Sequence, residues 1–151
     1  MTELKRTVRY AAASLFVVAL LGFALDQPAK ADDTQEIFVV VTSGDSETQM
    51  MAIVLSNQVV ARGASVRVLL CSEGGRLGIV GEDFPSFEPA GRTPQELLQN
   101  LMANGVTVEV CAIFLPNSEY DEDHLIEGVG IAEPPPIAEY MLKPNVRYFT
   151  F

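Results

Sequence analysis

The sequence predicts an α/β fold, a three-layer α/β/α sandwich with a mainly parallel sheet of about five strands. Short apolar runs alternate with helix-like segments along residues 32–151, an order typical of parallel sheets with right-handed crossovers. The first run, IFVVVT at residues 37–42, is apolar on both faces, as in a strand covered on both sides. The composition, 48% apolar and 20% charged, fits one folded domain.

The first strand, residues 37–42, leads through a turn at residues 43–45 into a predicted helix over residues 47–62. Ser46 and Gln49 have the spacing of a capping box at its start, and Gly63 is suited to its end. Helical spacing places six residues on one stripe: Met50, Met51, Val54, Leu55, Gln58 and Val59. A second strand, SVRVLLC, is predicted over residues 65–71.

The glycine-rich stretch at residues 72–92 is longer than most connections, so we expect a functional loop or a short helix there. Thr93, Pro94 and Glu96 form a complete helix-start signal, with a cap, a first-turn proline and a capping box. The helix is predicted to run to residue 104 with four residues facing inward: Leu97, Leu98, Leu101 and Met102. Further strands are predicted at residues 106–114, 129–131 and 146–151, with a short helix at 137–142.

Residues 1–31 have the pattern of a secretory signal peptide, with cleavage expected after Ala31. Basic residues precede fifteen uncharged residues at 11–25, and a small-x-small triplet follows at 29–31. A membrane-spanning helix usually needs about 20 apolar residues, so an uncleaved anchor is the less favoured alternative. The expected mature domain is residues 32–151, in the periplasm or another oxidising space outside the cytoplasm, with no stable membrane insertion after cleavage.

The charge is strongly acidic, with a net charge of −10 for the whole chain. Without residues 1–31, six basic and 18 acidic side chains remain, for a net charge of −12. Nucleic-acid binding is therefore not expected, because phosphates are bound by clustered Lys and Arg. The nucleotide-binding glycine motifs and the nucleophile-elbow motif of hydrolases are both missing from the sequence. The single histidine, His124, lies in an acidic run that we interpret as a solvated loop, and we expect no metal and no cofactor.

In a parallel sheet, ligands collect beyond the carboxyl ends of the strands. Three segments are expected there, at residues 43–46, 71–75 and 111–117. They include both cysteines, Cys71 and Cys111. Three interpretations are open: inert core cysteines, a structural or redox disulfide, or a reactive thiol activated by a helix N-terminus or by Arg76 or Arg92. A disulfide requires that their strands be neighbours, and the sequence does not determine the strand order.

The order of elements, and the segment at residues 104–112 with Gly105, Val106 and Cys111, resembles the sulfur-relay DsrE/DsrF-like family. The resemblance covers residues 36–151 and implies a compact α/β/α fold and a trimer or hexamer. It also implies that Cys111 accepts sulfane sulfur as a persulfide, with Cys71 as a possible resolving thiol and a protein as sulfur donor or acceptor. The signal peptide departs from this cytoplasmic family and argues against a role in tRNA thiolation.

Two functions from different classes follow. The first is an exported DsrE-like protein that transfers sulfur or exchanges thiols through Cys111. The second is a non-catalytic binding or assembly subunit of the same fold, in which Cys71 and Cys111 are packing residues or form a stabilising disulfide.

Overall fold

A computed structural model describes residues 35–151, and the predicted signal peptide lies outside the described residues. These residues form a five-stranded sheet in the order β4-β3-β2-β1-β5, in which every neighbouring pair is parallel. The strands are β1 (Glu36–Val41), β2 (Ser65–Leu70), β3 (Thr107–Cys111), β4 (Gly130–Ala132) and β5 (Val146–Thr150). The predicted α/β architecture with a mainly parallel sheet is confirmed.

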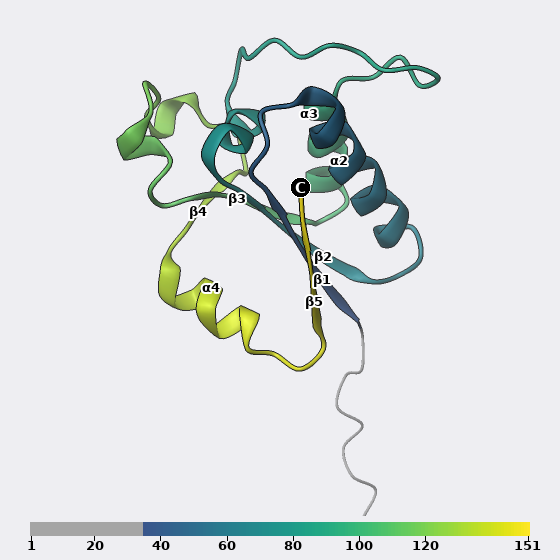
Figure 1. The fold of residues 1–151 in the computed structure, drawn as a ribbon, viewed down its shortest axis with the longest axis vertical. Helices are drawn as coiled ribbons and strands as arrows, with labels where there is room; N and C mark the ends of the chain where they lie inside the picture. Colours follow the sequence, from purple (N-terminus) through teal and green to yellow (C-terminus); the bar gives the residue numbers. More distant parts are fainter. Residues whose placement is uncertain (1–34) are drawn as a thin grey trace, which may run out of the picture. The chain divides into compact units, whose positions relative to one another are not determined.

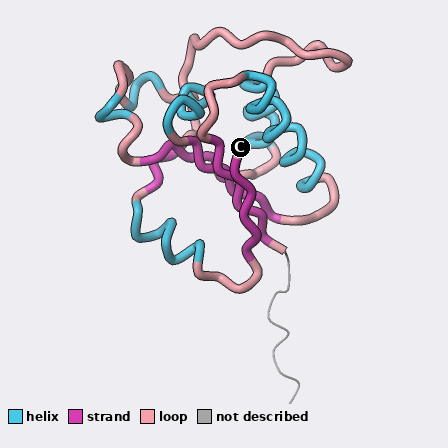
Figure 2. Tube along the Cα trace, in the orientation of Figure 1, coloured by secondary structure: helices cyan, strands magenta, loops and turns pink. Residues whose placement is uncertain are grey.

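Helices cover both faces of the sheet, which gives three layers (Figures 1 and 2). The helices α2 (Ser46–Val60) and α3 (Pro94–Ala103) lie on one face, and α4 (Pro134–Met141) lies on the other. Each face has its own core. The larger core packs Val39, Val68 and Val108 against α2 and α3, and the smaller one packs Phe38 and Leu69 against α4. This division explains why the strands are apolar on both faces.

The predicted start of α3 is confirmed in detail. The Thr93 hydroxyl accepts from the Glu96 backbone N–H at 3.1 Å, and the Glu96 carboxylate accepts from the Thr93 N–H at 2.8 Å. Pro94 occupies the first turn, where its missing N–H removes no helical hydrogen bond. Leu98 and Leu101 are fully buried, with Leu97 and Met102 half-buried beside them. The capping residues and the apolar stripe indicate the same helix, so the sequence alone predicted where α3 begins and which face it buries.

The prediction for α2 was wrong in two respects. The cap is Asp45, whose side chain accepts from the Thr48 N–H at 2.8 Å, so the helix begins one residue earlier than expected. Its buried face also differs from the predicted stripe, because Met51 and Leu55 are 53% and 46% exposed. Of the predicted stripe, Met50 is buried as expected, and the other buried residues of the helix are Gln49, Ala52, Ile53 and Ser56. Apolar residues lie all around this helix, so spacing alone did not identify its inner face.

Two segments beyond strand ends fold into tight turns or short helices. Residues Ser72–Gly78 form a 3₁₀ helix, η1, which is the short helix expected in the glycine-rich stretch. The strand predicted to reach residue 114 ends at Cys111, because the Phe114 N–H donates back to the Cys111 carbonyl at 2.8 Å. Two further short 3₁₀ helices follow, η2 (Leu115–Asn117) and η3 (Glu122–His124). No helix in residues 35–151 is both long enough and apolar enough to cross a membrane.

Candidate functional site: a cysteine pair at the carboxyl edge of the sheet

Cys71 and Cys111 lie side by side at the carboxyl ends of two adjacent strands. In the register of β2 and β3, Leu70 pairs with Val110, so the cysteines are the next pair along. Both side chains pack on the face of the sheet that α4 covers. Both thiols are free, and both residues are half-buried. Neighbouring strands are about 4.8 Å apart, a spacing within the Cα range of disulfides. The structure thus settles the strand order that the sequence left open.

The backbone after Cys71 is held in a tight turn. Ser72 has a φ of 50°, a left-handed conformation that is unfavourable for a residue other than glycine. The Cys71 N–H donates to the Val41 carbonyl at 2.9 Å, which ties the cysteine to the end of β1. Gly74 and Gly75 then allow η1 to lie directly against Val41 and the ring of Phe114, where a Cβ atom would be 2.2 and 2.5 Å from the nearest atoms. Close packing therefore positions Cys71.

A cleft of about 650 Å³ opens beside the two cysteines. Residues from three segments line it, namely the end of β2 with η1, the end of β3, and the loop that follows η2. They are Cys71, Ser72, Glu73, Arg76, Cys111, Ile113, Phe114, Asn117, Ser118, Glu119 and Tyr120. The cleft gives a small molecule or an extended segment of a partner access to the thiols, as a reactive-thiol interpretation requires.

The two thiols interact directly. Burial raises the pKa of the Cys71 thiol to about 12, and charge repulsion and a hydrogen bond with Cys111 add to the effect. A hydrogen bond raises the pKa of its donor when it stabilises the protonated form. Cys71 is therefore the donor and Cys111 the acceptor. Near neutral pH, Cys71 is therefore a protonated thiol.

We expect the alkylation of Cys71 by iodoacetamide to accelerate across the interval from about pH 9 to pH 12, because only the thiolate reacts and the pKa of Cys71 is raised to about 12. In a Cys111→Ser variant, repulsion by a second thiolate is removed, so the profile should move to lower pH while burial keeps it above that of a free thiol. Mass-spectrometric rates for Cys71 at stepped pH check this. An unshifted profile in the variant would show that the two thiols do not interact.

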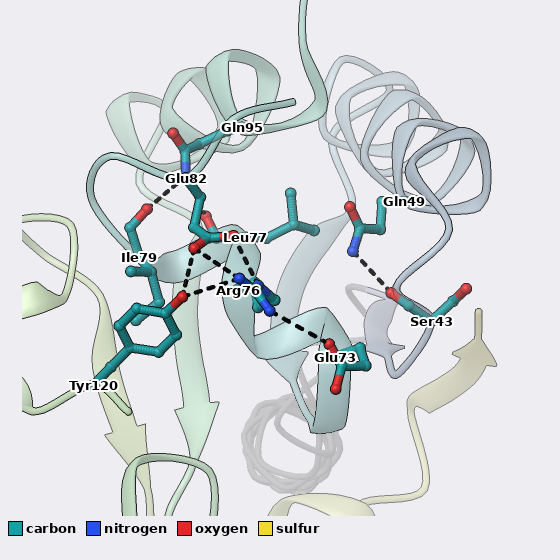
Figure 3. A network of polar contacts seen from close by, with 9 residues as sticks. All are labelled: Ser43, Gln49, Glu73, Arg76, Leu77, Ile79, Glu82, Gln95 and Tyr120. Atoms are coloured by element: carbon teal, nitrogen blue, oxygen red, sulfur yellow. Dashed lines mark hydrogen bonds and ion pairs between the residues drawn. The ribbon is translucent and has the colours of Figure 1, made fainter. Parts of the chain in front are cut away.

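Arg76 lies on the wall of the cleft, but its charge is already paired (Figure 3). Its Nε and Nη2 atoms donate to the two carboxylate oxygens of Glu82 at 2.8 and 3.1 Å. Nη2 also donates to the Tyr120 hydroxyl at 3.1 Å, and that hydroxyl donates to Glu82 at 2.5 Å. A weaker ion pair joins Arg76 to Glu73 at 3.9 Å. Arg76 holds the pKa of Glu82 below its usual range, and Glu82 raises the pKa of Tyr120 to about 12.

The structure brings together two of the three segments expected at the carboxyl edge. Residues 71–75 and 111–117 contribute to the cleft, whereas residues 43–46 are not among the residues that line it. Arg92 pairs with Glu96 at 3.1 Å and is not part of the lining either. Sequence reasoning missed Tyr120 and Glu82, which are 38 residues apart and meet only through the fold. His124 pairs with Asp121 at 2.7 Å, and no group of three or more His, Cys, Asp or Glu within residues 35–151 could hold a metal ion.

Comparison with known proteins finds the same fold elsewhere. No family model matches the chain. The YchN protein from E. coli aligns with a TM-score of 0.63 and 22% identity, over 78% of this chain and 99% of that one. The chain has the fold of YchN. The protein of unknown function MTH1491 from Methanobacterium thermoautotrophicum aligns with a TM-score of 0.60 and 18% identity, over the same two shares.

The likeness to YchN and MTH1491 confirms the compact α/β/α fold that the sequence resemblance implied. A likeness in sequence extends to an uncharacterized protein, MJ0760, from Methanocaldococcus jannaschii, which is 25% identical over 128 residues. That match covers 83% of this chain and 46% of MJ0760, so the chain spans about half the length of this curated relative. The YchN-like fold establishes the architecture, and the function has to be argued from the cleft.

Proposed function

We propose that this protein carries sulfane sulfur as a persulfide on Cys111, or exchanges thiols there, with Cys71 as the second thiol. One observation carries the proposal: two free cysteines are adjacent in register at the carboxyl edge of a parallel sheet, and both line an open cleft. The carboxyl edge is where ligands bind in open α/β sheets. Cysteines needed only for packing have no requirement for a cleft.

The proposed roles of the cysteines differ because their surroundings differ. The pKa of Cys71 is raised to about 12, so this residue keeps its proton and donates a hydrogen bond to the sulfur of Cys111. Because Cys71 holds its proton so firmly, Cys111 is the proposed attacking group of the pair. The assignment agrees with the role that the resemblance to the DsrE/DsrF-like family implies for this residue.

The chemistry needs no cofactor. The Cys111 thiolate attacks the terminal sulfur of a donor persulfide, R–S–SH, forming a new S–S bond while the donor S–S bond breaks. The protein then holds Cys111–S–SH, and the donor leaves as the thiolate R–S⁻. Either of two steps unloads the protein. An acceptor thiolate takes the terminal sulfur and returns the Cys111 thiolate, or Cys71 loses its proton and attacks Cys111, forming a disulfide and releasing hydrosulfide.

The decisive test is mass spectrometry of the native protein after incubation with a sulfane-sulfur donor. We expect an added mass of about 32 Da, one sulfur atom, mapped to the peptide that contains Cys111. The adduct should be missing from a Cys111→Ser variant that keeps the wild-type circular dichroism spectrum. A folded wild-type protein that gains no sulfur would overturn the proposal.

The competing function, a non-catalytic binding or assembly subunit, makes the opposite prediction for the thiols. If the cysteines only pack, both should resist a thiol-specific reagent until the protein unfolds. Labelling of Cys111 in the native protein, lost in Cys111→Ser, therefore favours the carrier. Because both residues line the cleft and neither is fully buried, we favour the carrier.

We also propose that the protein is exported, that its sulfur donor or acceptor is a protein, and that it forms a homo-oligomer such as a trimer or hexamer. Export is supported by the signal-like pattern of residues 1–31. N-terminal sequencing of the protein from its native host should begin at Asp32, and a start at Met1 would contradict cleavage. Light scattering of the purified protein tests the oligomeric state.

A further inference from the structure

The charges around the cleft point to the kind of partner that reaches the cysteine pair. Three charged side chains line the cleft: Glu73, Arg76 and Glu119. Arg76, the single cation among them, is neutralised by its two-pronged contact with Glu82. The side chain of Glu73 is 67% exposed, and Glu119 is exposed as well. The wall around the thiols is therefore negative, with no positive group available to hold an anion.

A second hollow continues the acidic surface. Tyr120 lines both the main cleft and an adjoining one of about 400 Å³. Asp121, Glu122 and Glu133, all exposed, line this second hollow. Together the two hollows are larger than a small aminothiol needs, and they extend the negative surface away from the thiols. An extended segment of chain with positive side chains would match the charge of both hollows.

We propose that the substrate of the cysteine pair is a cysteine flanked by basic side chains on a partner polypeptide, and that small anionic sulfur compounds are disfavoured. This inference rests on the proposed function and specifies the partner in it. Cys111 reacts as a thiolate, so a negative substrate meets repulsion from the thiolate and from Glu73 and Glu119. Positive side chains near the reacting sulfur reverse that effect and concentrate the partner at the cleft.

The test measures the rate at which reduced native protein reacts with disulfides of different charge. Two peptides of equal length each carry one cysteine as a mixed disulfide with 2-mercaptoethanol, and the cysteine is flanked by Lys in one peptide and by Glu in the other. Cystamine and dithiodipropionate serve as small cationic and anionic probes. Each rate is divided by the rate of the same probe with free 2-mercaptoethanol, which removes intrinsic differences in reactivity. The attack joins Cys111 to the probe sulfur and releases the other half as a thiolate.

We expect the Lys peptide to react about tenfold or more faster than the Glu peptide at low ionic strength, with the difference shrinking as salt is added. The preference should fall in a Glu73→Gln, Glu119→Gln double variant. The matched control is Glu139→Gln in α4. Glu139 lines neither hollow, so this substitution removes a charge without altering the walls around the cysteines.

A third variant tests the role of the paired arginine. Glu82→Gln removes the carboxylate that neutralises Arg76, so the reaction with the Glu peptide should become faster, whereas a purely structural role for Glu82 would slow both peptides. Equal normalised rates for the two peptides in the wild-type protein would overturn the inference and leave the proposed function standing. A preference for cystamine without one for the Lys peptide would also overturn it, because the partner would then be a small molecule. No reaction of Cys111 with any probe would instead overturn the proposed function.

Discussion

In a Cys71→Ser variant, a persulfide on Cys111 is expected to release hydrosulfide about tenfold or more slowly than in the wild-type protein at alkaline pH. The two residues are adjacent in register on β2 and β3, so Cys71 is held next to the sulfur that it attacks. Serine has a similar size and can still donate a hydrogen bond to Cys111, but its hydroxyl does not displace hydrosulfide. The variant should therefore keep the loaded form and lose only its internal route of release.

The pH dependence has a definite direction. Attack by Cys71 requires its thiolate, and the pKa of Cys71 is raised to about 12. Release by the wild-type protein should therefore accelerate as pH rises through the alkaline range, while release by the variant should not follow that rise. The measurement is hydrosulfide trapped over time from protein loaded with one sulfur, with the Cys71–Cys111 disulfide quantified in the same samples. Equal rates without a disulfide would mean that only external acceptors unload Cys111.

A Gly74→Ala variant is expected to lose about 1–3 kcal/mol of unfolding free energy, the usual cost of forcing an extra methyl group into a packed site. The added Cβ would lie 2.2 Å from the Val41 carbonyl oxygen and 2.7 Å from its carbon. Both are backbone atoms of a central strand, so neither can move aside without distorting β1. The same oxygen accepts the Cys71 N–H, so the substitution should also displace the cysteine.

The matched control is Gly130→Ala in β4, where the nearest atom to an added Cβ is the Glu109 side-chain Cγ at 3.2 Å. A flexible side chain can shift slightly, so this variant should cost clearly less. Urea denaturation of both variants and of the wild type measures the difference, and alkylation of Cys71 in the native state reports its displacement. Equal denaturation midpoints for Gly74→Ala and the wild type would show that η1 does not pack on β1 as described.

The sequence was most informative where one local signal was enough. The capping box at Thr93 and the inward-facing leucines of α3 were both predicted, because the cap and the stripe belong to one short segment. The inner face of α2 was not predicted, since the exposed Met51 and Leu55 are as apolar as the buried Met50 and Ile53. Which side of that helix meets the sheet depends on the direction in which the chain leaves β1.

By itself, the sequence determined the fold class and placed both cysteines at the carboxyl edge, because the alternation of strands and helices is written locally in the pattern of side chains. Only the tertiary structure decided that β2 and β3 are neighbours and that Cys71 and Cys111 are therefore adjacent in register. It also decided that Glu82 pairs with Arg76. These contacts join residues that are distant along the chain. Strand order and the packing of long loops bring such residues together, and no local pattern encodes those choices.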